Sequence, residues 1–267
     1  MRKFFILGLF FSVSSALFLT SCKKEKKNDN DKEYPSTAVI LRNAVSDIDG
    51  NSYDAVQIGS QIWMAENLRT SRYADGAEIP LGPSSSTTSP YRYNPNNDAN
   101  NVSTYGYLYN WPAIMHGESG SDANPSGVQG ICPNGWHVPS IAEWKQLTNY
   151  VGSQSQYICG NDTSYIAKAI SATTGWYNSM EPCAVGNDLS ANNATGFSAL
   201  PAGDFRDGYY NFFGETASFW SATDFSGSDY GIPFTRVYYL FLYLHSANVQ
   251  ESGFVKDYGL SVRCVRD

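Results

Sequence analysis

The sequence has few of the residues and motifs on which catalytic sites depend. It contains only three histidines, His116, His137 and His245, and it has no glycine-rich phosphate loop, no HExxH and no GxSxG. These absences argue against the common signatures of nucleotide-binding proteins, zinc peptidases and serine hydrolases. We therefore expect a protein that is not an enzyme and that needs no organic cofactor.

Basic residues are also scarce in most of the chain. Beyond residue 38 there are eleven Lys and Arg against twenty-one Asp and Glu, which gives a net charge of −10. Because such a surface repels phosphate, nucleic acid is not expected as a partner. Tyr, Phe and Trp are abundant (19, 14 and 6 residues), and Gly, Asn, Ser and Asp recur at short intervals. This composition predicts many short strands joined by long ordered loops.

The longest hydrophobic run, residues 4–19, stands at the N-terminus after two basic residues. It is shorter than a comfortable membrane-spanning helix, and its layout is typical of an export signal. The sequence LTSC at residues 19–22 resembles a bacterial lipobox, in which the cysteine is lipidated and becomes the new N-terminus. We expect residues 1–21 to be the signal peptide and Cys22 to carry the lipid. The alternative is an ordinary cleaved signal with an incidental cysteine.

Residues 22–38 combine charges of both signs and show no apolar periodicity. They are predicted to form a solvated tether between the lipid and the folded part. Residues 39–267 are then long enough for one domain with a real core. A lipid anchor makes the membrane a partner and predicts an outer-membrane lipoprotein of the cell envelope. Whether it faces the periplasm or the cell surface is left open.

The chain has no CxxC pair, and its cysteine spacings fit no zinc ribbon. Besides Cys22 there are four cysteines, at Cys132, Cys159, Cys183 and Cys264. An even set in an exported protein predicts two disulfides, for which three pairings are possible. A cysteine held in a disulfide cannot serve as a thiolate nucleophile.

The segment GICPNGWHVPSIAEWKQLTNYVG, residues 130–152, predicts the best-defined helix. Ser140 and Glu143 form a capping box, and apolar residues recur after them at near-helical spacing. Glu143 therefore has a role in holding the backbone, and Trp144 is predicted to be a core residue. His137 precedes the cap, and we expect it to be a packed or surface imidazole rather than a catalytic one.

A weaker helical pattern covers residues 164–176. Residues 187–208 follow it and are rich in side-chain oxygens, among them Asp188, Asn192 and Asn193. Oxygen ligands suit calcium, so a structural calcium ion is one interpretation of this stretch. A network of hydrogen-bonded turns is the other interpretation, and we favour it.

Residues 236–245, RVYYLFLYLH, are the most apolar stretch after the N-terminal run, but they are too short to cross a bilayer as a helix. As a strand they place leucines on one face and aromatic residues on the other. We expect both faces to be buried, as in a strand covered on two sides. The alternative is an aromatic face that is open to a ligand.

Residues 204–220, DFRDGYYNFFGETASFW, combine flat aromatic rings with planar polar side chains. This combination favours a surface that binds a glycan or a surface protein. The expected contact residues are Asp204, Arg206, Asp207, Tyr209 and Tyr210. We expect the two tyrosines to be exposed at a turn, and Trp220 to belong to the core. The alternative is that the aromatic residues of this stretch simply pack beneath a long loop.

Several stretches resemble one protein family. IGSQIWMAENLRTSRYADG, YGYLYNWPA, CPNGWHVPSIAEWKQL, NATGFSALPAGDFRDG, FWSAT and YGLSVRCVRD follow one another over residues 45–267 as in the Fibrobacter succinogenes major paralogous domain family. The resemblance implies an α+β fold distantly similar to the C-type-lectin-like fold, which is shared with formylglycine-generating enzymes. Such a fold has two helices, small twisted antiparallel sheets, long ordered loops and neighbouring chain ends. The resemblance also implies an exported protein of the Bacteroidetes or Fibrobacteres.

The same resemblance bears on the cysteines and on activity. It implies that Cys132 pairs with Cys264, which leaves Cys159 and Cys183 for the second bridge. The enzymatic relatives use two redox-active, copper-binding cysteines late in the chain, where this sequence has Cys264 alone. The sugar-binding lectins use Glu-Pro-Asn or Gln-Pro-Asp, and residues 181–183 offer only Glu-Pro-Cys. We therefore expect a lipid-anchored, non-catalytic binding or adhesion module. A divergent enzyme of the formylglycine-generating type and a purely structural envelope protein are the alternatives.

Overall fold

The computed structural model describes residues 38–229 and 232–267, and all of these belong to one compact unit. The predicted signal peptide, Cys22 and nearly all of the predicted tether lie outside the described residues. The described part is a mixed fold, in which short helices are interspersed with small antiparallel sheets.

The larger sheets have five and three strands, and neighbouring strands in both are antiparallel. The five-stranded sheet has the order β1 (Val39–Ser46), β2 (Ser52–Ile58), β3 (Gln61–Met64), β12 (Val265–Arg266) and β6 (Trp136–His137). The three-stranded sheet has the order β11 (Gln250–Phe254), β10 (Ile232–Tyr243) and β9 (Thr216–Asp229). Two short hairpins pair β4 (Arg92–Tyr93) with β5 (Leu108–Tyr109) and β7 (Asp204–Arg206) with β8 (Tyr209–Asn211).

Four α-helices occur in the described part, where the sequence led us to expect two, so that expectation is wrong. They are α1 (Val102–Tyr105), α2 (Trp111–Met115), α3 (Ile141–Gly152) and α4 (Ala167–Ile170). The 3₁₀ turns are η1 (Pro95–Asn97), η2 (Ala99–Asn101), η3 (Ser155–Tyr157) and η4 (Leu189–Ala191). Only α3 is longer than five residues.

The pattern over residues 164–176 yields only α4, because the chain after it is held by another segment. Ala199 donates its backbone N–H to the Ile170 carbonyl and accepts one from Ala172. Ser171 forms an isolated parallel bridge with Ala199, in an extended conformation that no helix can continue. Tertiary pairing therefore overrides the local helical pattern at this point.

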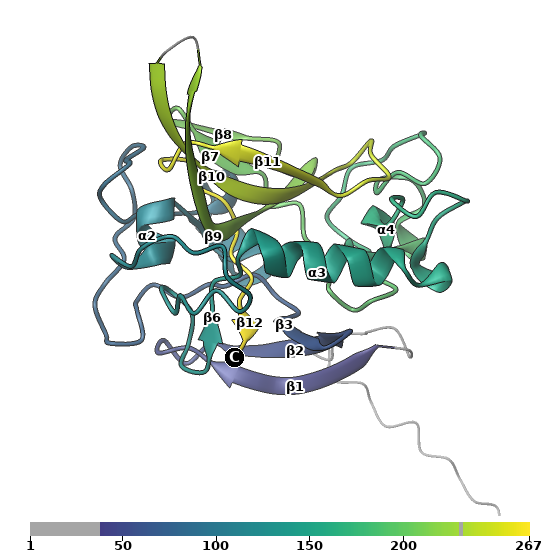
Figure 1. Ribbon diagram of the computed structural model, residues 1–267, viewed down its shortest axis with the longest axis horizontal. Helices are drawn as coiled ribbons and strands as arrows, with labels where there is room; N and C mark the ends of the chain where they lie inside the picture. Colours follow the sequence, from purple (N-terminus) through teal and green to yellow (C-terminus); the bar gives the residue numbers. More distant parts are fainter. Residues whose placement is uncertain (1–37, 230–231) are drawn as a thin grey trace, which may run out of the picture. The chain divides into compact units, whose positions relative to one another are not determined.

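The helix α3 begins as the sequence predicts and lies between the two larger sheets (Figure 1). The Ser140 Oγ accepts the Glu143 N–H at 3.2 Å, and the Glu143 carboxylate accepts the Ser140 N–H at 2.9 Å. Trp144, the fourth residue of the helix, is fully buried. Its ring centroid lies 4.5 Å from that of Trp63 in β3 and 5.8 Å from that of Phe219 in β9. One indole thus joins the helix to both sheets.

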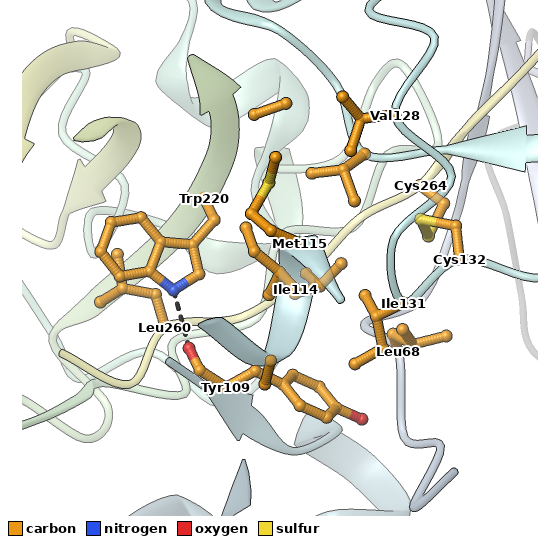
Figure 2. Close-up of a cluster of buried hydrophobic side chains, with 14 of the residues drawn as sticks. Leu68, Tyr109, Ile114, Met115, Val128, Ile131, Cys132, Trp220, Leu260 and Cys264 are labelled. Carbon is orange, nitrogen blue, oxygen red and sulfur yellow. Dashed lines mark hydrogen bonds between the residues drawn. A yellow bond between two sulfur atoms is a disulfide. The ribbon is translucent and has the colours of Figure 1, made fainter. Parts of the chain in front are cut away.

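A second cluster of buried side chains gathers around α2 and the C-terminal segment (Figure 2). The Trp220 indole, which the sequence assigned to the core, is 1% exposed and donates to the Tyr109 carbonyl at 2.7 Å. Figure 2 also shows the apolar members Leu68, Ile114, Met115, Val128, Ile131 and Leu260. Around Tyr239, Leu240 and Leu242 the strand β10 is covered on both faces, because the two leucines join the cluster around Trp144 while Tyr239 joins this one.

The two predicted disulfides are present, as Cys132–Cys264 and Cys159–Cys183. Their sequence separations are 132 and 24 residues. The loop-entropy model assigns such bridges roughly 5 and 3.5 kcal/mol of stabilisation. The longer-range bridge fastens the segment before β12 to the segment before β6.

A buried arginine holds the C-terminal segment as well. Arg263 is fully buried, and its guanidinium donates to the backbone carbonyls of Met64, Phe197 and Ser198. Its Nε donates to the Asn67 side chain at 2.7 Å. The guanidinium carbon lies 4.6 Å from the centre of the Phe197 ring, in a cation–π contact. Because its charge is met by dipoles and an aromatic face, this cation is tolerated in the core.

Candidate functional site

The hairpin of β7 and β8 contains all five residues that the sequence predicted as a ligand surface. Its two-residue turn is Asp207-Gly208, and both residues have positive φ, of 53° and 82°. Asp-Gly is a preferred pair for such turns, because the twist of the turn matches that of the two strands. The short turn fixes the register, in which Arg206 lies opposite Tyr209 and Asp204 opposite Asn211.

The register divides the side chains of the hairpin between two faces. Asp204, Arg206, Tyr209 and Asn211 share one face, which we call the polar hairpin face. Tyr210 lies on the other face, where it is half-buried and its ring centroid is 5.0 Å from that of Phe205. The structure therefore separates Tyr210 from the other predicted contact residues, and the expectation that it is exposed beside Tyr209 is wrong. Side-chain alternation within β8 is the cause.

Two aromatic residues, one in the polar hairpin face and one directly after it, are open to solvent. Tyr209 is 71% exposed, and Phe212, directly after β8, is 41% exposed. The Arg206 guanidinium carbon lies 4.8 Å from the centre of the Phe212 ring, and its Nε lies 3.5 Å from the Asp204 carboxylate. Phe212 has a φ of 56°, a left-handed conformation that costs a bulky residue free energy. An exposed ring is thus held in a strained position over an arginine.

The acidic group of this face has an unusual environment. Asp204 is only 5% exposed, and burial raises the pKa of its carboxyl to about 6, against the opposing effects of Arg206 and the Asn211 hydrogen bond. Burial also raises the pKa of Tyr239 to about 12, and Asp204 adds to this rise. A buried carboxyl with a displaced pKa at the edge of an exposed aromatic surface is a candidate for contact with a ligand.

A second cluster of ionisable groups surrounds His137, which is 2% exposed. Its Nε2 lies 2.7 Å from the Glu143 carboxylate, and its Nδ1 lies 2.6 Å from that of Asp267. The other oxygen of Glu143 accepts the backbone N–H groups of Ser140 and Ser126. Burial lowers the pKa of His137, but the two carboxylates outweigh it, and the net shift is upward. The cluster therefore favours the charged imidazolium.

The histidine cluster borders a cavity of about 220 Å³, which is lined in part by Trp136, His137 and Asp267. Both ring nitrogens of His137 are already engaged by carboxylates. A general base needs a free nitrogen within hydrogen-bond reach of its substrate. In this arrangement the histidine fastens the C-terminal residue to the first turn of α3.

Two of the three predicted calcium ligands, Asn192 and Asn193, take part in hydrogen bonds within the chain. The Asn192 amide donates to the carbonyls of Ala172 and Val185, and the Asn193 side-chain oxygen accepts the Ser198 N–H at 2.8 Å. Across the part of the chain that the structure describes, no three His, Cys, Asp or Glu side chains form a group that could hold a metal ion. The asparagines instead fix turns through hydrogen bonds.

A lysine side chain provides the positive charge in this loop. Lys168, on α4, is 8% exposed, and its Nζ donates to the backbone carbonyls of Ala184, Asn187 and Asp188. Burial lowers the pKa of Lys168, and the nearby Asp188 carboxylate opposes that shift. We call these three carbonyls, with the ammonium they surround, the lysine cage.

Sequence reasoning missed the histidine cluster, the lysine cage and the buried Arg263. Most of their partners are far apart in the chain: Asp267 is 130 residues from His137, and the carbonyls of the cage begin 16 residues after Lys168. Every residue has a backbone carbonyl, so the sequence does not show which carbonyls surround a buried cation. The one available signal was the pairing of a lone lysine with an oxygen-rich loop that follows it.

The fold and its two disulfides define a mixed helix-and-sheet domain whose described helices include none with the length and apolarity of a membrane span. The model of the Fibrobacter succinogenes major domain matches residues 56–266. Because this match covers well over half of the chain, the protein belongs to that family, as the sequence resemblance implied. No curated protein and no solved structure matches the chain.

Proposed function

We propose that the protein is a non-catalytic binding or adhesion module of the cell envelope, anchored through a lipid on Cys22. Its ligand is a glycan or a surface protein that contacts the polar hairpin face. The observation that carries this proposal is the 71% exposure of Tyr209 beside Arg206, on a hairpin whose opposite face packs into the structure.

The chemistry of the polar hairpin face supports recognition rather than turnover. The face of an aromatic ring carries partial negative charge, which attracts the C–H groups of a sugar or a cationic side chain. Arg206 and Asp204 supply planar donors and acceptors beside the exposed rings. If the Asp204 carboxylate accepts hydrogen bonds from the ligand, binding should strengthen as the pH rises through about 6, where this group ionises.

A distant relation to the C-type-lectin-like fold is also part of this proposal. Two features support it: β1 and β12, near the two ends of the described chain, share one sheet, and α3 packs between small antiparallel sheets. The calcium-dependent sugar site of the lectins is not part of the proposal, because residues 181–183 lack the third oxygen ligand.

The competing function is an enzyme, and one observation favours it. His137 and Asp267 line a cavity of about 220 Å³, and a buried histidine between two carboxylates is a common catalytic arrangement. For His137 to take a proton from a substrate, Asp267 would first have to leave Nδ1. The double variant Arg206→Ala/Tyr209→Ala would leave such an activity unchanged, whereas His137→Gln would abolish it.

The proposal is tested with the full-length protein in a detergent that has no sugar headgroup, applied to arrays of glycans and of surface proteins. Arg206→Ala/Tyr209→Ala should weaken any binding about tenfold or more without altering the melting temperature. Tyr150→Ala removes a ring of 38% exposure from α3 and is the matched control. Full-strength binding by the double variant would rule out the polar hairpin face.

A further inference from the structure

The sheet of β9, β10 and β11 has a second candidate surface. It lies on the face that is turned away from Tyr239 and from the hairpin of β7 and β8. A cavity of about 440 Å³ lies there, between the last turns of α3 and the strands β10 and β11. This volume falls in the range of small-molecule sites. Ile166, Leu240 and Val249 supply its apolar lining, and Thr148, Asn149 and Glu251 are among its polar lining residues.

The charges around this cavity favour a neutral ligand. None of the lining residues is basic, and the one acidic group, Glu251, forms an ion pair with Lys145 at 3.4 Å. An anionic ligand would meet a carboxylate with no free cation in the lining. The exposed Asn149 amide can both donate and accept hydrogen bonds, and the Thr148 hydroxyl, which donates to the Lys145 carbonyl at 3.2 Å, can accept them. Apolar walls with hydroxyl and amide groups suit a polyhydroxylated molecule that also has C–H faces.

A row of aromatic rings continues from the cavity along the same face of the sheet. The register pairs Leu240 with Glu251 and Tyr238 with Gly253, so Tyr238 is the next residue of β10 on that face. The centroid of the Phe225 ring lies 4.4 Å from that of the Tyr238 ring and 6.0 Å from that of the Phe234 ring. We call Tyr238, Phe225 and Phe234 the aromatic row.

Two glycines allow these rings to lie low on the sheet. A β-carbon on Gly253 would come within 2.7 Å of the Phe225 ring, and one on Gly227 within 2.7 Å of the Phe234 ring. Each ring therefore rests over a position that has no side chain. The outer parts of β9 and β10 extend past the segment that β11 covers, and they project from the sheet in Figure 1. All three rings of the row are half-buried.

We propose that this face binds a neutral oligosaccharide, with one sugar unit in the cavity and the following units along the aromatic row. The inference rests on the proposed function, because it takes the protein to be a binding module, but it uses a different surface from the polar hairpin face. In the cavity the sugar hydroxyls bond to Asn149 and Thr148 while its C–H face meets Val249, which is partly exposed. Beyond the cavity, sugar rings stack on the aromatic row, beside the Arg236 guanidinium, whose carbon lies 4.6 Å from the centre of the Phe234 ring.

The test uses the full-length protein, again in a detergent without a sugar headgroup. Glucose, mannose, galactose and N-acetylglucosamine are titrated calorimetrically as monomers and as linear hexamers, with sulfated hexamers alongside. At least one neutral series should bind, and its hexamer should bind more tightly than its monomer. Hexamers that are sulfated on the unit in the cavity should bind more weakly than the neutral ones, because the cavity lining contains Glu251 and no basic residue.

Two variants separate the cavity from the aromatic row. Ser153→Trp places an indole at a residue of the cavity lining and should reduce binding of monomer and hexamer alike by about tenfold or more. Ser155→Trp, two residues further on and outside the lining, is the matched control. The double variant Phe225→Leu/Phe234→Leu should reduce hexamer affinity roughly tenfold and leave the monomer unchanged, since each stacked ring contributes separately.

Each contrary result has a defined meaning. If no neutral sugar binds, or if Ser153→Trp binds at full strength, the inference is overturned. If sugar binding is lost only in Arg206→Ala/Tyr209→Ala, the inference is overturned while the proposed function stands. If binding to this face is found only for proteins or for sulfated glycans, the ligand class is wrong. Melting temperatures of all variants should match that of the unmodified protein, so that loss of binding is not loss of fold.

Discussion

Replacing Trp144 by alanine should remove the largest single contribution to the core from α3. The side chain is fully buried, and its ring lies within 6.0 Å of the Trp63, Phe197 and Phe219 rings, measured between centroids. Its indole N–H donates to the Trp220 carbonyl at 3.2 Å. The truncation would therefore leave a cavity between the two larger sheets and an unpaired carbonyl beside it.

The expected cost follows from these contacts. Truncating a buried tryptophan to alanine costs about 3–5 kcal/mol, because the lost transfer free energy is joined by that of the cavity. Three ring pairs, each contributing about 0.5–1.5 kcal/mol, and one hydrogen bond of about 1 kcal/mol place this site at the upper end. A loss of about 5 kcal/mol corresponds to a melting temperature roughly 10–20 °C lower for a domain of this size.

Urea and thermal unfolding of the full-length protein, followed by circular dichroism under oxidising conditions, measure this loss. Trp144→Phe keeps a ring in the core but removes the indole N–H, and it should cost less than the alanine variant. Tyr150→Ala, on the exposed side of the same helix, should change the free energy of unfolding by less than about 1 kcal/mol. An unchanged melting temperature for Trp144→Ala would refute the packing of α3 described above, and the ring would then have to be considered as a ligand platform.

Four further predictions follow from the sequence and the structure. Cys22→Ala should abolish metabolic acyl labelling and membrane partitioning, and retention of both would exclude lipidation at this residue. Replacing both Cys132 and Cys264 by alanine should lower the free energy of unfolding by up to about 5 kcal/mol, and peptide mapping without reductant that finds either thiol free would contradict the bridge. Because the pKa of His137 is raised in the folded state, its stabilisation should be complete below the unfolded pKa of about 6.5 and should decline as the pH rises through the folded value. His137→Gln should flatten that part of the stability profile, and an identical profile would show that the histidine is not the responsible group. Ser140→Ala should cost about 1 kcal/mol in urea unfolding, with no loss disproving the contribution of the cap.

Features set by neighbouring residues were predictable from the sequence. The capping box of α3 needs only Ser140 and Glu143, three positions apart, and the alternation in residues 236–245 needs only the period of a strand. The two-residue turn at Asp207-Gly208 belongs to the same kind, since its backbone preference is local. Each of these sequence patterns spans no more than a dozen residues, and the local structure that it predicts is present in the folded chain.

Features set by distant partners could not be predicted in the same way. The weak helical pattern at residues 164–176 does not form a long helix, because Ser171 pairs with Ala199 instead. No local propensity reveals this pairing. Tyr210 does not belong to the polar hairpin face, because its ring packs against Phe205 on the other side of the hairpin, where Phe205 also stacks on Tyr93. The aromatic row depends on β10 bringing together residues of β9 and β11 that are 28 positions apart, Phe225 and Gly253. The sequence contains these residues but not their adjacency.

The lysine cage has a consequence for how this protein responds to its surroundings. A loop that is cross-linked by a diffusible divalent ion loosens when the ion is removed by a chelator or when its external concentration falls. In this loop the ammonium of Lys168 is attached covalently, so it cannot be washed out or exchanged. The loop should therefore keep its conformation in EDTA and at any concentration of divalent cations in the medium. Its sensitivity is instead to alkaline conditions, in which the buried amine gives up the proton that holds the three carbonyls together.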